Sequence, residues 1–320
     1  MKHFIAIIGL FIGLGLLLNG CDSSLSTNNS ELNTTAGESQ TKVLGAQAYI
    51  QGNVVTVTEN DLGPSERPEG FGEEGYEAPE YKWYTPTHGD NPLNTEGATF
   101  GFDAGPDNPE TFGNGSFLFD VPAGERSWIL TDQYGTGEWH GEPDAKKGTR
   151  LDEITTLAYS TFISNELSDG SLQTATVVPS MQIMAQDSEG NFLPLIFDPQ
   201  GNTLTGEWQR WNAIESAGWR TEDWASCEFD DGSTWSQVTE ACEDAKVLWA
   251  IGIAAGTWPN QDFHGYTDLL TVGVDGEETT YDFEVSPATK QDCKRGGWQG
   301  FDFRNQGQCI RFVNTGKDSR

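Results

Sequence analysis

Between Thr99 and Glu284, short runs of alternating or continuous apolar residues recur, separated by Gly, Asn, Asp and Pro. Side chains on a strand alternate between its two faces, so such runs are typical of strands that cover a core. We predict ten strands, at 99–103, 115–121, 126–132, 155–164, 177–186, 192–198, 205–213, 246–254, 266–274 and 279–285. No repeat of fixed length is present, which argues against a β-propeller. We therefore expect an all-β fold, a two-sheet antiparallel jelly-roll sandwich with one short helix.

Three of these strands carry further information. Residues 246–254 are continuously apolar, which indicates a strand buried on both faces. Asp275-Gly276 separates the last two strands, and Gly accepts the positive φ of a tight hairpin turn. In 266–274, the two-residue period predicts that Asp268 shares one face with Leu270, Val272 and Val274. Asp268 would then be a lone carboxylate on an apolar face.

One segment has a helical pattern. Trp235, Val238, Cys242 and Ala245 follow one another at spacings of three, four and three residues. Ser233 or Thr234 provides a side chain suited to cap the N-terminus.

The N-terminus has the pattern of an export signal. Lys2 precedes fifteen uncharged apolar or Gly residues at 4–18, which is shorter than the roughly 20 residues that a membrane span needs. Leu18-Asn19-Gly20-Cys21 follows and resembles the lipobox of bacterial lipoproteins. That resemblance implies cleavage before Cys21 and acylation of Cys21, hence a lipid anchor in the cell membrane or outer membrane. A plain secretory signal stays open as the alternative.

Cysteine usage agrees with export. Five cysteines are an odd number, but acylation of Cys21 leaves four. These four fall into two local pairs, so we predict disulfides Cys227–Cys242 and Cys293–Cys309. Neither pair has the close CxxC spacing of a zinc site.

The charge balance restricts the partners. With 18 Lys and Arg against 49 Asp and Glu, the formal net charge is −31. A nucleic acid or an anionic lipid surface would be repelled, so neither is expected as the main partner. The densest acidic run spans 59–80, where eight acidic residues face a single Arg67. It is either a solvated face, which includes adaptation to salt, or a surface that binds divalent cations.

The composition divides the chain into five segments. We expect a signal peptide at 1–20, a disordered Ser/Thr/Asn-rich tether at 21–44 and an acidic strand and loop segment at 45–98. The sandwich would span 99–286, followed by a basic, disulfide-closed module at 287–320. Within the third of these segments, at 59–95, we expect a long loop or an extended insertion that carries the aromatic residues Tyr81, Trp83 and Tyr84.

Two segments resemble known bacterial domains. Gly113–Phe119, Ile154–Thr161, Val178–Ile183, Gly206–Asn212 and Phe263–Leu269 with Thr280–Glu284 resemble exported sandwiches of the concanavalin A-like, laminin-G-like class. Such domains bind glycans or calcium, and some are glycan hydrolases or lyases, so the likeness implies a fold and no single activity. Cys293-Lys-Arg-Gly-Gly-Trp298 and Asn305-Gln-Gly-Gln-Cys-Ile-Arg-Phe312 resemble a short C-terminal module of exported proteins. We expect this module to pack on the domain or to bind an anionic surface polymer.

Tryptophans suggest a polysaccharide partner. Seven of the eleven Trp lie between 208 and 258, and an indole stacks well on the apolar face of a sugar ring. Trp208 and Trp211 are three residues apart on one strand, so they point to opposite faces. The candidate glycan-binding residues are Trp211, Trp219, Trp224 and Trp258. Core and loop packing is the alternative for all four.

Acidic residues suggest structural Ca²⁺. The candidate ligands are Asp103, Asp107 and Asp268, because calcium prefers carboxylate and amide oxygens. The Asp187-Ser-Glu-Gly-Asn191 stretch offers similar oxygens. Arg210 is an alternative partner for Asp268, and ordinary turns are the alternative for the others.

The sequence assigns no catalytic residue. It has no nucleophile elbow, HExxH, P-loop or Glu-x-Asp-x-Glu strand pattern. His140 with Glu138 and Asp144 is a candidate base or metal trio, and His264 with Asp262 and Asp268 is another. For a lyase, Tyr266 and His264 are the candidate bases. We therefore favour a non-catalytic, lipid-anchored envelope protein that binds glycan or supports adhesion. A polysaccharide lyase or glycoside hydrolase, and a structural protein without ligand, stay open.

Overall fold

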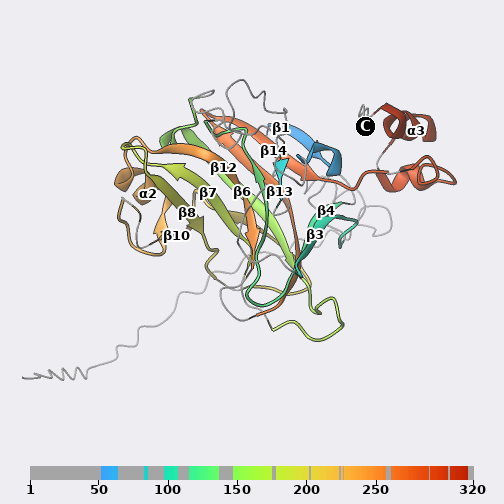
Figure 1. Ribbon diagram of the computed structural model, residues 1–320, viewed down its shortest axis with the longest axis horizontal. Coiled ribbons are helices and arrows are strands. Elements are labelled where there is room, and N and C mark those ends of the chain that lie inside the picture. Colours follow the sequence, from blue (N-terminus) through green and yellow to red (C-terminus); the bar gives the residue numbers. More distant parts are fainter. Residues whose placement is uncertain are drawn as a thin grey trace, which may run out of the picture. The chain divides into compact units, whose positions relative to one another are not determined.

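Two seven-stranded β-sheets, here called sheet A and sheet B, form the described part of the chain (Figure 1). This computed structural model describes residues 52–63, 83–85, 97–106, 115–136, 147–174, 178–201, 203–222, 225, 227–256, 261–287, 289–301 and 303–315. The inward side chains of both sheets join in one apolar core, with Phe117 and Phe283 from sheet A and Ile183 and Ile251 from sheet B among its fully buried members. The predicted all-β sandwich is confirmed.

Sheet A is organised around its longest strand. One edge of β13 pairs first with β4 and then with β14, while its other edge pairs with β6 along most of its length. Hydrogen-bonded neighbours follow one another in the order β1 (Asn53–Val57), β14 (Glu277–Phe283), β13 (Phe263–Val274), β4 (Ser116–Val121) and β3 (Thr99–Asp103). β6 (Ile154–Ile163) pairs with the opposite edge of β13, and β9 (Trp208–Asn212) pairs with β6. β1, which precedes the segment predicted as the sandwich, joins sheet A as a strand parallel to β14.

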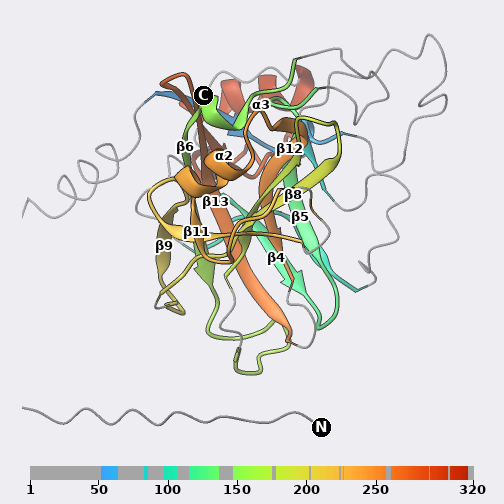
Figure 2. The ribbon, with the colours of Figure 1, turned by 90° about the vertical axis from the view of Figure 1, so that its left-hand side faces the viewer.

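Sheet B is antiparallel throughout its pairings. Its spatial order is β11 (Ser233–Thr234), β10 (Ala217–Thr221), β8 (Phe192–Phe197), β7 (Ser180–Gln186), β12 (Lys246–Ala255), β5 (Ser127–Thr131) and β2 (Trp83–Tyr84). β12 lies between β7 and β5 and is buried along nearly its whole length, as its continuous apolar sequence predicts. Figure 2 labels strands of both sheets, among them β13 of sheet A and β12 of sheet B.

All ten predicted strands are present, with ends that differ by three residues at most. Strands β2, β10 and β11 and a second helix were not predicted. β2 lies within the expected long loop, and β10 forms outside the ten predicted strands because its Trp219 is buried against Phe197 and Trp235. A second helix, α3 (Gln306–Thr315), forms in the C-terminal module, so the prediction of one short helix is incomplete.

A bulge in β13 changes the face on which Asp268 lies. Asp268 pairs with Ser160 and Thr271 with Ala158, so β13 contains one residue more than β6 between the two pairs. Leu269, with φ of 52°, is at this bulge. The two-residue period therefore shifts: Leu270 and Val272 point into the core, whereas Asp268 and Thr271 share the outer face. The prediction that Asp268 shares the apolar face is wrong for this reason.

The predicted helix and hairpin are confirmed. α2 (Trp235–Ala241) has Thr234 as its N-cap, whose side chain accepts from the Gln237 N–H. Val274 pairs with Glu277 across a two-residue turn, and Asp275 and Gly276 both have positive φ, as this turn type requires. Short 3₁₀ helices occur at η1 (Glu59–Asp61), η3 (Leu151–Glu153) and η4 (Gly297–Phe301).

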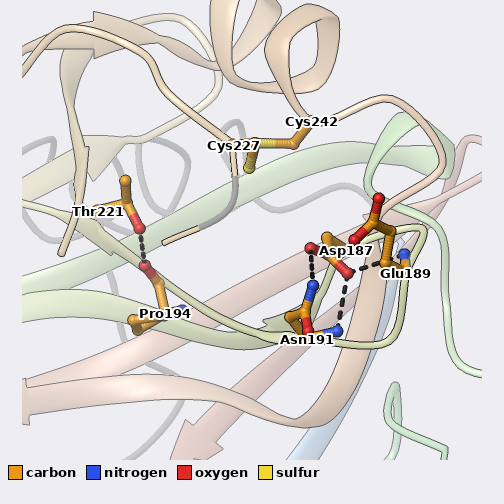
Figure 3. Close-up of a disulfide and its surroundings, with 7 residues drawn as sticks. All are labelled: Asp187, Glu189, Asn191, Pro194, Thr221, Cys227 and Cys242. Atoms are coloured by element: carbon orange, nitrogen blue, oxygen red, sulfur yellow. Dashed lines mark hydrogen bonds between the residues drawn. A yellow bond between two sulfur atoms is a disulfide. The ribbon is translucent and has the colours of Figure 1, made fainter. Parts of the chain in front are cut away.

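Both predicted disulfides are present. Cys227 and Cys242 join the segment after β10 to the end of α2, close to the β7–β8 turn (Figure 3). In that turn Asp187 Oδ1 accepts from the Glu189 and Asn191 N–H groups, at 2.9 and 2.8 Å, and Oδ2 accepts from the Asn191 side chain. Here the carboxylate closes a turn. The second bond, Cys293–Cys309, lies within the C-terminal module.

The residues 289–315, here called the C-terminal module, have a small apolar core of their own. Cys293, Phe303, Cys309 and Phe312 are buried in it, separately from the sandwich core. No helix among the described residues is long and apolar enough to cross a membrane.

Candidate functional site

A row of half-buried aromatic side chains crosses the outer face of sheet A. Trp208 on β9 is opposite Phe162 on β6, and Phe162 is opposite Tyr266 on β13. Directly paired residues point to the same side of a sheet, so the three rings are neighbours. The ring centroids are 5.6 Å apart for Trp208 and Phe162, and 6.2 Å apart for Phe162 and Tyr266. We call these three rings the aromatic row.

The aromatic row faces away from the core because of the strand period. Trp211 on the same strand packs against the sandwich core and donates its indole N–H to Thr161 Oγ1 at 2.8 Å. Trp208 is three residues earlier and therefore points to the other face, as the sequence predicted for this pair. Its indole N–H donates to the Pro106 carbonyl at 3.1 Å, which fixes the orientation of the ring.

His264 extends the aromatic row toward the start of β13. Its ring centroid is 5.8 Å from that of Tyr266. His264 Nδ1 lies 3.4 Å from Asp120 Oδ1 on the paired strand β4, a distance for an ion pair rather than for a good hydrogen bond. The Gln173 side chain holds the His264 backbone, accepting from its N–H at 2.5 Å and donating to its carbonyl at 2.9 Å.

The electrostatics around Tyr266 work against its ionisation. Burial, followed by the negative charges of Asp103 and Asp120, raises the pKa of the Tyr266 phenol above its usual range. A phenol that acts as a general base must lose its proton near neutral pH. Tyr266 is therefore a stable hydrogen-bond donor and ring surface in this environment.

A polar cavity of about 370 Å³ opens further along the same face. Its lining includes Arg210, Asn212, Glu215 and Glu278, together with threonines of β6 and β13. The Arg210 guanidinium donates to Thr271 Oγ1 at 2.9 Å and to the Leu269 carbonyl at 3.3 Å, which holds it flat against the sheet. The cavity therefore presents donors and carboxylate acceptors beside the aromatic row.

Buried carboxylates lie next to this cavity, where β13 passes from β4 to β14. Asp268, Asp282 and Glu284 are each at most 2% exposed. Asp268 Oδ1 accepts from the N–H groups of Leu269 and Phe283 at 2.7 and 2.9 Å, and Oδ2 has no hydrogen-bond partner among the described residues. Burial, then the charge of Asp282, raises the pKa of Asp268 well above its usual range, despite the two backbone donors that lower it.

A second, larger cavity of about 980 Å³ lies at the β7–β8 turn and the start of β12. Its lining includes Lys147, Arg150 and Lys246 together with Asp187 and Asp244. Arg150 donates to Asp244 at 2.5 Å and to Asp152 at 2.8 Å, so its charge is engaged by carboxylates. Tyr134, whose hydroxyl bonds that of Tyr281 at 2.8 Å, is the only aromatic residue in this lining among the described residues.

The predicted glycan-binding tryptophans lie elsewhere. Trp219 is 0% exposed, and its indole N–H donates to the Ala213 carbonyl at 2.7 Å, so it offers no ring face to a ligand. Trp211 is partly buried against the core. Trp224 and Trp258 lie outside the described residues. The aromatic row instead uses Trp208, Phe162 and Tyr266. Simple alternation along β13 would have placed Tyr266 on the core face with Leu270, because it ignores the bulge at Leu269.

The predicted calcium ligands are not brought together as a set. Asp103 is exposed at the end of β3 and accepts from the Ala104 N–H at 2.6 Å, whereas Asp268 is buried. Asp107 lies outside the described residues, as do Cys21, His140, Glu138 and Asp144. Over the part of the chain that the structure describes, no three His, Cys, Asp or Glu side chains form a group that could hold a metal ion. Calcium binding stays a prediction.

Comparison of the chain with protein-family models, with curated proteins and with solved structures gives no match.

Proposed function

We propose that this chain is an exported, non-catalytic envelope lipoprotein whose sandwich binds a polysaccharide on the outer face of sheet A. The observation that carries the proposal is the aromatic row of Trp208, Phe162 and Tyr266 beside the Arg210 cavity. Rings supply a surface for the apolar face of a sugar, and the cavity supplies donors and acceptors for its hydroxyls.

The charges favour a neutral sugar. Asp120 and Asp103 lie near Tyr266, and Glu215 and Glu278 line the cavity. Carboxylates accept hydrogen bonds from sugar hydroxyls but repel a uronate or a sulfate. The net charge of −31 acts in the same direction.

A glycan array with the purified protein identifies the ligand, and calorimetry with that ligand then tests the surface. We expect Trp208→Ala and Tyr266→Ala each to weaken binding by about threefold to tenfold, because a stacked ring contributes about 0.5–1.5 kcal/mol. Trp249→Ala is the matched control, since Trp249 is also half-buried but stacks on Phe192, 4.6 Å away, on sheet B. Equal affinity of the two sheet A variants and the wild type would contradict the proposal, as would loss of binding in the control.

A glycan-active enzyme on the same face is the second candidate. The observation that favours it is the approach of His264 Nδ1 to Asp120 Oδ1, at 3.4 Å, beside the aromatic row, because an imidazole close to a carboxylate is a common arrangement in acid–base catalysis. The raised pKa of Tyr266 argues against a lyase that uses this phenol as its base. Release of reducing ends from the array ligand by the wild type, and its loss in His264→Ala, would establish this second function.

The lipid anchor is part of the proposal and has a separate test. Labelling of cells with an alkyne fatty acid should mark the wild-type chain and leave a Cys21→Ser variant unmarked. A labelled variant, or an unlabelled wild type whose Cys21 is in a disulfide, would contradict acylation at this position.

A further inference from the structure

The C-terminal module reverses the charge of the rest of the molecule. Residues 289–315 contain five basic and two acidic residues, whereas the whole chain has 18 basic and 49 acidic ones. All five basic side chains are exposed: Lys290, Lys294, Arg295, Arg304 and Arg311. None of the five forms an ion pair with another described residue. The charge is therefore directed to solvent.

One disulfide and one ring contact hold together the segments that carry four of these cations. The Cys293–Cys309 bond, with Cα atoms 5.6 Å apart, brings Lys294 and Arg295 beside the helix that carries Arg311. Phe303 packs on Phe312 with ring centroids 5.4 Å apart, which brings Arg304 to the neighbourhood of Arg311. We call Lys294, Arg295, Arg304 and Arg311 the basic patch.

The backbone at Arg295 is strained. Its φ is 55°, in the left-handed region that disfavours a side chain and suits glycine. Gly296 and Gly297 follow, so the turn already contains glycines. An exposed arginine that holds a strained conformation, without an ion-pair partner, points to a role outside folding.

The apolar side chains of the module are turned inward. Cys309 and Phe312 on α3 are buried, and Ile310 and Val313 pack against the same small core. The exposed large apolar residues among the described ones, Val54, Leu172 and Leu204, all lie outside the module. Insertion into a lipid surface needs an exposed apolar face, which this helix lacks.

We propose that the basic patch is a binding site for an anionic polysaccharide that carries carboxylate or sulfate groups. Arginine forks match both groups, and four cations on a rigid, disulfide-closed scaffold suit repeated charges along a polymer. At about 0.1 M salt, charges more than roughly 10 Å apart are largely screened, so the local excess of basic residues in the module governs this contact more than the net charge of the whole chain does. This site is distinct from the aromatic row and does not depend on it.

Dextrans of one length, in sulfated, carboxymethylated and unmodified form, separate charge recognition from sugar recognition. The full-length protein in detergent is titrated with each fluorescent dextran in 0.1 M NaCl, and anisotropy is measured. We expect binding of the two charged dextrans, loss of that binding in 1 M NaCl, and no binding of plain dextran through this patch. Absence of binding of both charged dextrans by the wild type would overturn the proposal.

Arg295→Gly tests the patch without damaging the fold. Glycine relieves the backbone strain, so we expect an unchanged or higher Tm, together with about tenfold weaker binding from the loss of one charge-assisted contact. Arg295→Gly with Arg311→Gln should weaken binding further. Lys147→Gln with Lys246→Gln, which removes the same charge from the sandwich, is the control and should bind as the wild type does. Equal loss in both double variants would overturn a patch-specific site.

Two further probes distinguish other polyanions, and Trp208→Ala separates the two proposed sites. Duplex DNA, or vesicles that contain phosphatidylglycerol, should bind more weakly than the charged dextrans, and stronger binding of either would overturn the assignment to a polysaccharide. Trp208→Ala should keep full affinity for the charged dextrans. Its failure to do so would place their binding on sheet A instead.

Discussion

Replacement of Trp219 by alanine should destabilise the sandwich itself, which goes beyond the loss of a single contact with a ligand. The indole is 0% exposed, with ring centroids 4.8 Å from Trp235 and 5.4 Å from Phe197. Truncation of such a buried Trp costs about 3–5 kcal/mol. It also leaves the Ala213 carbonyl without its hydrogen-bond donor, and an unsatisfied buried polar group lowers stability by about 1–3 kcal/mol.

The sum is close to the whole stability of a typical domain, which is about 5–15 kcal/mol. We therefore expect Trp219→Ala to be partly unfolded at 37 °C, and Trp219→Phe, which keeps an aromatic ring but not the donor, to lose about 1–3 kcal/mol. Urea unfolding under non-reducing conditions, followed by far-UV circular dichroism, measures both. Trp208→Ala is the comparison, since Trp208 is half-exposed on sheet A.

The result that would refute this reasoning is a Trp219→Ala protein within about 1 kcal/mol of the wild type, the range of ordinary surface substitutions. It would mean that the indole is not in the core, and Trp219 would again be a candidate for stacking on a sugar.

Three other substitutions test particular features. The raised pKa of Asp268 means that the folded chain holds a proton that the unfolded chain releases, so the contribution of Asp268 to stability is highest below the usual Asp pKa and falls by about 1.4 kcal/mol per pH unit as pH rises toward the folded pKa. Asp268→Asn should remove this pH-dependent contribution, which urea unfolding from pH 4 to 7 measures as the difference in unfolding free energy between wild type and variant. A difference that does not change with pH would disprove the argument. Cys227→Ser with Cys242→Ser opens a loop with a sequence separation of 15 residues and should lower the free energy of unfolding by about 3 kcal/mol; an unchanged urea midpoint would show that this bond adds nothing. Gly252→Ala places a Cβ against the Ile129 carbonyl of the paired strand, so we expect the free energy of unfolding to fall by about 1–3 kcal/mol or more. A Tm equal to that of the wild type would mean that β12 and β5 are further apart than the structure shows.

The sequence determined the elements that depend on local pattern. The ten strands of the sandwich follow the two-residue period, α2 follows its apolar spacing with a Thr cap, and the Asp275-Gly276 turn follows from positive φ at both positions. The two disulfides join cysteines that are close in sequence, so their pairing was also within reach.

Only the tertiary structure decided on which face of its sheet each side chain lies. One extra residue at Leu269 turns Asp268 from the apolar face to the outer face, and a bulge leaves no mark in a simple alternation pattern. Trp219 lies outside the ten predicted strands, but contacts with Phe197 and Trp235, distant in sequence, make its segment a buried strand. The aromatic row exists because Trp208, Phe162 and Tyr266 are paired across three strands. Register between distant strands depends on long-range packing, and a period along one strand carries no information about which neighbour lies opposite.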